Sequence, residues 1–115
     1  WIGATDMVRK GLCSILASDY YYPAMLLAAL RLVAEEVLPL PKAWALISRN
    51  PAMAAGMPER GLIAQGYRAD ILLVDAAHGV RPKVVGVIVA GRIVYLTDAS
   101  RLSTSAAVSR KVVAA

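Results

Sequence analysis

The segment Gly11-Leu-Cys-Ser-Ile-Leu-Ala-Ser-Asp19-Tyr-Tyr-Tyr-Pro23 combines a short apolar run, a carboxylate and the start of a helical pattern. Residues 12–17 are apolar on both faces, which is typical of a buried parallel strand. In α/β folds, residues that carry chemistry gather where strands end and helices begin. Asp19 lies at such a place and is therefore the first candidate functional residue.

Helical patterns flank this expected strand. A short helix before it is closed by Gly11 at the C′ position, where a positive φ is common. Residues 23–38 form the clearest helix, because Pro23 is tolerated in a first turn and Pro39 cannot continue the helix. A further helix is expected over residues 41–49.

Extended patterns dominate later in the chain. Residues 70–75 form an apolar strand between two acids, and residues 84–89 and 92–96 form a β-branched pair. Ala90-Gly91 joins this pair as a hairpin turn, in which Gly91 takes the left-handed position that Ala90 would resist.

The pattern divides the chain into two unlike halves and a tail. Residues 1–56 are expected to be the end of an α/β barrel or sheet, with Asn50 capping a last helical turn that stops at Gly56. Residues 57–97 are expected to form part of a small antiparallel sheet. The Ser- and Ala-rich tail, residues 98–115, is expected to be disordered.

The composition of the chain argues against a membrane and against nucleic acid as binding partners. The longest uncharged stretch, residues 20–30, is shorter than the roughly 20 residues that cross a bilayer, so no membrane span is expected. The net charge is +5, but the 13 Lys and Arg residues are dispersed, which argues against nucleic-acid binding. One cysteine cannot form an internal disulfide, so the cysteine count either indicates a cytosolic protein or is uninformative, and we expect a cytoplasmic protein.

The apolar content is high for a chain of 115 residues, at 58% hydrophobic. The helix over residues 23–38 is apolar around most of its circumference and needs cover. We therefore expect self-association through this helix, or a missing part of the same polypeptide. The start at Trp1, without methionine, favours the second interpretation, a fragment.

The run Arg60-Gly61-Leu-Ile-Ala-Gln-Gly66-Tyr-Arg-Ala-Asp70-Ile-Leu-Leu-Val-Asp75 and the later run Val87-Ile-Val-Ala-Gly91-Arg-Ile-Val94 resemble the closing segment of the amidohydrolase superfamily. The resemblance implies an α+β fragment: the last strand and helices of a (β/α)8 barrel, followed by part of a small antiparallel β-sandwich. The segment over residues 16–23 is similar to the phosphonate-metabolism branch of that superfamily. That branch hydrolyses the triphosphate of ribose 1-methylphosphonate 5-triphosphate and releases diphosphate.

This resemblance assigns roles to individual residues. It implies that Asp19 is both catalytic and metal-binding, holding a divalent metal (zinc or similar) and taking the proton of the attacking water. It places Tyr20 and Tyr21 near a phosphorylated small-molecule substrate. The barrel histidines of the superfamily have no counterpart in this sequence, so the chain alone is expected to be inactive.

Other interpretations stand beside these. The parent protein could be another amidohydrolase that acts on C–N bonds, or the chain could be a small stand-alone binding or assembly domain. Without the resemblance, the favoured explanation of Asp19 is a helix-capping or loop residue. Arg68 could hold phosphate, but the neighbouring Asp70 favours a sheet-edge role. Trp44 is expected in the core, and His78 in a solvated loop.

Overall fold

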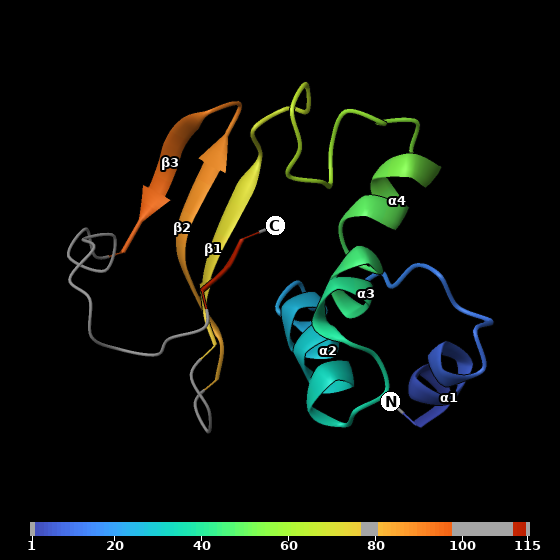
Figure 1. Cartoon of the computed structure of the whole chain (residues 1–115). Helices are drawn as coiled ribbons and strands as arrows, with labels where there is room; N and C mark the ends of the chain where they lie inside the picture. The colour runs from blue at the N-terminus through green and yellow to red at the C-terminus, as the bar shows by residue number, and fades with distance from the viewer. Residues whose placement is uncertain (1, 77–80, 98–111, 115) are drawn as a thin grey trace. The chain divides into compact units, whose positions relative to one another are not determined.

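The computed structural model describes residues 2–76, 81–97 and 112–114 (Figure 1). The chain divides into two compact units, Trp1–Leu62 and Ile63–Ala115. The first unit is helical and the second contains an antiparallel sheet. Residues 57–62 belong to the first unit, in which the backbone at Gly61 packs directly against the backbone of Arg49.

The helical unit contains α1 (Ile2–Arg9), α2 (Ala24–Ala34), α3 (Leu40–Ala45) and α4 (Arg49–Ala54). Its core is a cluster of apolar side chains from the first three helices and the turn after α3: Val8, Leu32, Ala43 and Leu46. Among the described helices, none has the length and apolar character that a membrane span requires.

Helices α1 and α4 end at glycines, as the sequence predicts. Gly11 has φ +70° and Gly56 has φ +71°. After α1 the N–H of Gly11 donates to the carbonyl of Val8 at 2.9 Å, and the N–H of Leu12 donates to the carbonyl of Met7 at 2.9 Å. This is the Schellman pattern, which satisfies the last free carbonyls of a helix.

Helix α2 is shorter than the expected range of residues 23–38, because it ends at Ala34. Glu36 adopts φ +54°, and the N–H of Val37 donates to the carbonyl of Leu32 at 2.9 Å. Val37 thereby folds back onto the core around Leu32. The helix is closed by this turn before Pro39 can end it, so the predicted C-terminal boundary was wrong.

The expected helix over residues 41–49 is also divided differently. Helix α3 ends at Ala45, and Ser48 precedes α4 as its N-cap residue. Asn50 is therefore inside α4 and is not the cap that the sequence suggested. Its side-chain amide instead donates a 2.7 Å hydrogen bond to the carbonyl of Ser14.

Residues 12–17 do not form the expected strand in this structure but follow an irregular path. A strand needs a neighbouring strand to accept its ladder hydrogen bonds, and none lies beside this segment in the described residues. The N–H of Leu16 bonds instead to the carbonyl of Leu46 at 2.9 Å. Leu12 and Ile15 remain 67% and 37% exposed.

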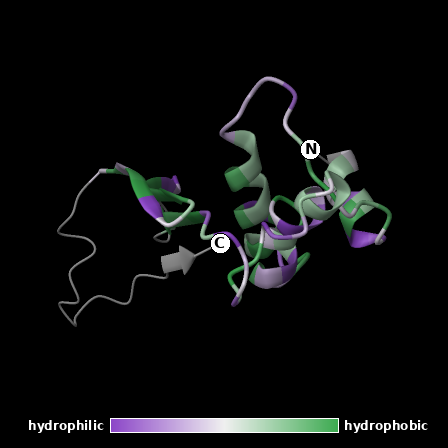
Figure 2. Cartoon of the chain, turned by 90° about the horizontal axis from the view of Figure 1, so that it is seen from above, coloured by the Kyte–Doolittle hydropathy of each residue, from purple (hydrophilic) through white to green (hydrophobic). Residues whose placement is uncertain are grey.

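The second unit is a four-stranded antiparallel sheet with strand order β3-β2-β1-β4. Its strands are β1 (Ile71–Asp75), β2 (Lys83–Val89), β3 (Arg92–Leu96) and β4 (Val112–Ala114). The first three confirm the predicted strands, apart from single-residue shifts at the start of β1 and β2. Figure 2 shows that these strands are largely hydrophobic.

Part of the expected disordered tail, residues 98–115, is ordered. Residues 112–114 form β4 and pair with β1 in antiparallel register. The expectation of disorder was therefore wrong for these three residues, whose backbone belongs to the sheet. The rest of that tail, residues 98–111 and 115, lies outside the described residues.

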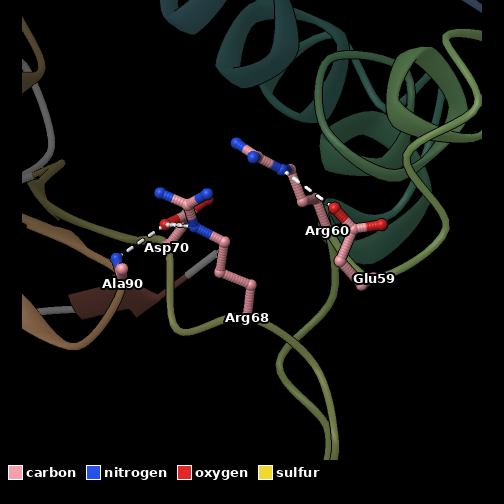
Figure 3. Close-up of polar contacts among 5 residues, drawn as sticks. All are labelled: Glu59, Arg60, Arg68, Asp70 and Ala90. Carbon is pink, nitrogen blue, oxygen red and sulfur yellow. Dashed lines mark hydrogen bonds and ion pairs between the residues drawn. The ribbon is translucent and has the colours of Figure 1, made fainter.

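The hairpin turn between β2 and β3 differs from the prediction at Ala90. Val89 pairs with Arg92 on either side of a two-residue loop. Ala90 has φ +49° and Gly91 has φ +78°, so both residues are left-handed, which is the mark of a type I′ turn. Ala90 accepts this conformation because its N–H donates a 2.8 Å hydrogen bond to Asp70 Oδ1 (Figure 3).

Candidate functional site

Asp19 lies in a bend between the irregular segment, residues 12–18, and helix α2. The chain is fixed on both sides of this bend. Before it, the N–H of Leu16 is bound to the Leu46 carbonyl, and after it the N–H of Ala24 donates to the Tyr21 carbonyl at 3.0 Å. The side chain of Asp19 is exposed, so its carboxylate is open to a ligand.

Three tyrosines follow the acid and present their rings to solvent. Tyr20 is 90% exposed, Tyr21 55% and Tyr22 86%. The structure thus places Asp19, Tyr20 and Tyr21 together in one exposed turn, as their adjacency in sequence requires. A carboxylate can accept protons or hydrogen bonds, and phenol hydroxyls can donate to phosphate oxygens. A group of large exposed aromatic rings is typical of a surface that contacts a ligand or another protein.

The described residues do not fit a complete metal centre. No group of three or more His, Cys, Asp or Glu side chains in the described part of the chain could hold a metal ion. Catalytic zinc sites use three protein ligands, so Asp19 can supply one ligand but cannot bind the metal alone. His78 lies outside the described residues.

The segment that leads to Asp19 rests on the helical core. The side chains of Cys13 and Leu16 pack against the cluster that contains Leu32 and Leu46. The Cys13 thiol lies 3.1 Å from the carbonyl of Ile15, to which it donates. These contacts fix the approach to the bend without regular secondary structure.

Sequence reasoning missed the contact between Asn50 and Ser14, because an Asn-Pro pair at a helix start is most simply explained by capping. Two other interpretations are confirmed. Trp44 is buried, at 8% exposure. Arg68 Nε donates to Asp70 Oδ1 at 3.0 Å, so this arginine serves the sheet edge (Figure 3).

Comparison with known proteins gives independent information about the family of this chain. A model of the amidohydrolase family matches residues 5–95. The chain is 39% identical over 74 residues to the alpha-D-ribose 1-methylphosphonate 5-triphosphate diphosphatase of Escherichia coli (strain K12). The match covers 63% of this chain but only 20% of that relative's length. No solved structure matches the chain significantly.

Proposed function

The chain belongs to the amidohydrolase family, and from this premise we propose that it forms the C-terminal part of a metal-dependent hydrolase. The proposed reaction is hydrolysis of the triphosphate of ribose 1-methylphosphonate 5-triphosphate, with release of diphosphate, in cytoplasmic phosphonate catabolism. The observation that carries the proposal is the sequence identity to the Escherichia coli diphosphatase, which spans most of this chain.

The proposed architecture is the end of a (β/α)8 barrel followed by part of a β-sandwich. Residues 12–17 would be the last barrel strand, and they would pair only when the preceding barrel strands are present. Their apolar character and the exposure of Leu12 and Ile15 support this, because such side chains need cover that the described residues do not give.

Asp19 is the proposed catalytic residue. Its part is to accept the proton of the attacking water, for which an open carboxylate held by a fixed backbone is suited. It would also supply one oxygen ligand to a divalent metal. Because the described residues cannot complete a metal centre, the other ligands must come from elsewhere in the enzyme.

Tyr20 and Tyr21 are proposed to contact the phosphorylated substrate. Their support is their position directly after Asp19 and their exposure. We also propose that helix α2 contributes to self-association, since Leu27 on this helix stays 37% exposed. Analytical ultracentrifugation of the wild type and Leu27→Lys tests that point, and an unchanged mass for the variant would contradict it.

Hydrolysis of a C–N bond, as in a cyclic amide, is the second candidate, and the family membership favours it. The two reactions are separated by assaying the full-length protein that contains this chain with both substrate classes. We expect diphosphate release from the triphosphate substrate and no turnover of a cyclic amide. The opposite result would replace the first proposal with the second.

The role of Asp19 is tested in the same full-length protein. Asp19→Asn keeps the size of the side chain but removes the proton acceptor, and we expect kcat to fall by about 100-fold or more. Asp6→Asn is the matched control, because Asp6 is an acid on α1 that forms a surface ion pair with Arg9, at 3.0 Å. Full activity of Asp19→Asn, or turnover by residues 1–115 alone, would contradict the proposal.

A further inference from the structure

The position of Asp19 depends on an irregular segment that has few hydrogen bonds of its own. In the part of the chain that the structure describes, the bonds that join residues 13–18 to later elements come from the Leu46 carbonyl and the Asn50 side chain. Leu46 accepts from the N–H of Leu16, which any residue at position 46 could do. Asn50 is different, because the bond comes from its side chain.

The Asn50 amide spans a long stretch of sequence. Its Nδ2 donates to the Ser14 carbonyl at 2.7 Å, and the two residues are 36 positions apart. Asn50 lies in the first turn of α4, where an asparagine side chain would ordinarily cap the helix. Here the capping position belongs to Ser48, and the Asn50 amide is directed to the segment that leads to Asp19.

The start of α4 is itself held firmly. The backbone of Gly61, with φ +77°, approaches so closely that a Cβ there would lie 2.7 Å from the Arg49 Cα and 2.8 Å from the Ser48 carbonyl carbon. Ser48 Oγ also donates to the Trp44 carbonyl at 3.0 Å, and Trp44 is buried. Asn50 therefore extends its amide from a rigid base.

We propose that Asn50 is a positioning residue for Asp19: its amide fixes the Ser14 carbonyl and so holds the segment over residues 14–18 that presents the carboxylate. This inference rests on the proposed function of Asp19. Polar partners that orient a functional side chain commonly change activity by 10- to 100-fold when removed, without touching the substrate. Asn50 belongs to that class of residue.

The test uses the full-length protein and the variants Asn50→Ala and Asn50→Asp. The aspartate keeps the size of the side chain but cannot donate to a carbonyl when ionised. We expect kcat to fall about 10- to 100-fold in both variants, with KM changed less than threefold, because the substrate contacts remain. Asp6→Asn is the control, since it changes a surface ion pair with Arg9 on α1 and leaves both residues 14–18 and the start of α4 untouched.

A second measurement is independent of activity. Hydrogen exchange at the Leu16 amide, which is bound to Leu46, should be faster in both Asn50 variants and unchanged in Asp6→Asn and Asp19→Asn. Wild-type kcat, or wild-type exchange at Leu16, would overturn the inference. Failure of both Asn50 variants to fold would also overturn the inference, because Asn50 would then be required for folding rather than for positioning Asp19. Full activity of Asp19→Asn would instead reject the proposed function, while the exchange result would still report on the Asn50 anchor.

Discussion

The carboxylate of Asp70 accepts a 2.8 Å hydrogen bond from the backbone N–H of Ala90, twenty residues later in the chain. The same oxygen accepts from Arg68 Nε at 3.0 Å. Beside it, the N–H of Gly91 donates to the Ala69 carbonyl at 2.9 Å. The residues before β1 thus hold the turn between β2 and β3, and one acid sets the geometry of the sheet end (Figure 3).

Asp70→Ala should destabilise the sheet unit. Hydrogen bonds to charged groups contribute about 1.5–3 kcal/mol each, and Asp70 is largely shielded, with 26% side-chain exposure. We expect the free energy of unfolding to fall by about 2 kcal/mol, measured by urea denaturation. Asp70→Asn keeps an oxygen acceptor for Ala90 and should lose about half as much. Asp6→Ala, which removes a surface ion pair, should change stability by less than about 1 kcal/mol; equal losses in Asp70→Ala and Asp6→Ala would contradict the assignment.

Ala90→Asn should stabilise the same hairpin. The substitution creates Asn-Gly, the pair that best suits a type I′ turn, and it keeps the backbone N–H that donates to Asp70. Because alanine at φ +49° is strained, we expect a gain of about 0.5–1 kcal/mol in unfolding free energy. Gly91→Ala is the reverse experiment and should lower the unfolding free energy by about 1 kcal/mol. A loss of stability in Ala90→Asn would show that the turn is not of this type in solution.

Gly61→Ala should be far more damaging than Gly56→Ala. Both glycines have positive φ, +77° and +71°, so both alanines pay a conformational cost of about 1 kcal/mol. A Cβ at Gly56 would meet nothing within 4 Å, whereas one at Gly61 would collide with the backbone of Arg49. We therefore expect Gly61→Ala to lose about 2–4 kcal/mol, since backbone overlap cannot be relieved by a rotamer change. Thermal unfolding of the two variants gives the comparison, and similar melting temperatures would refute it.

Local sequence patterns predicted several of the helix ends and strands of this fold. Gly11 and Gly56 identified helix ends, because few other residues accept a left-handed C′ position at low cost. The strand pair around Ala90-Gly91 followed from its β-branched pattern. Glu36 ends α2 with the same kind of turn as those glycines. A glutamate does not indicate a positive φ, so this helix end could not be predicted from the sequence.

Features that depend on distant partners could not be predicted in this way. Residues 12–17 have the composition of a strand, but a strand also needs a neighbour, and composition does not show whether one is present. Asn50 was interpreted by its local role as a cap, whereas its amide contacts Ser14, far away in sequence. For the candidate site, the sequence proposes Asp19, Tyr20 and Tyr21, and these roles stay predictions. The structure adds the contacts of Ser14 and Leu16 that hold the segment before Asp19.

Because the tyrosines after Asp19 are exposed, their effect on stability can be separated from their effect on substrate binding. Tyr20 and Tyr22 are 90% and 86% exposed, so replacing either by alanine should change the free energy of unfolding by less than about 0.5 kcal/mol. If Tyr20 and Tyr21 contact the substrate, Tyr20→Ala and Tyr21→Ala in the full-length protein should raise KM by about 10-fold, the effect of losing a hydrogen bond of roughly 1.4 kcal/mol. Tyr22→Ala is the matched control and should leave KM unchanged. Steady-state kinetics of diphosphate release give these values, and an equal rise in KM for Tyr20→Ala and Tyr22→Ala would contradict a specific role for Tyr20, because both rings are equally open to solvent.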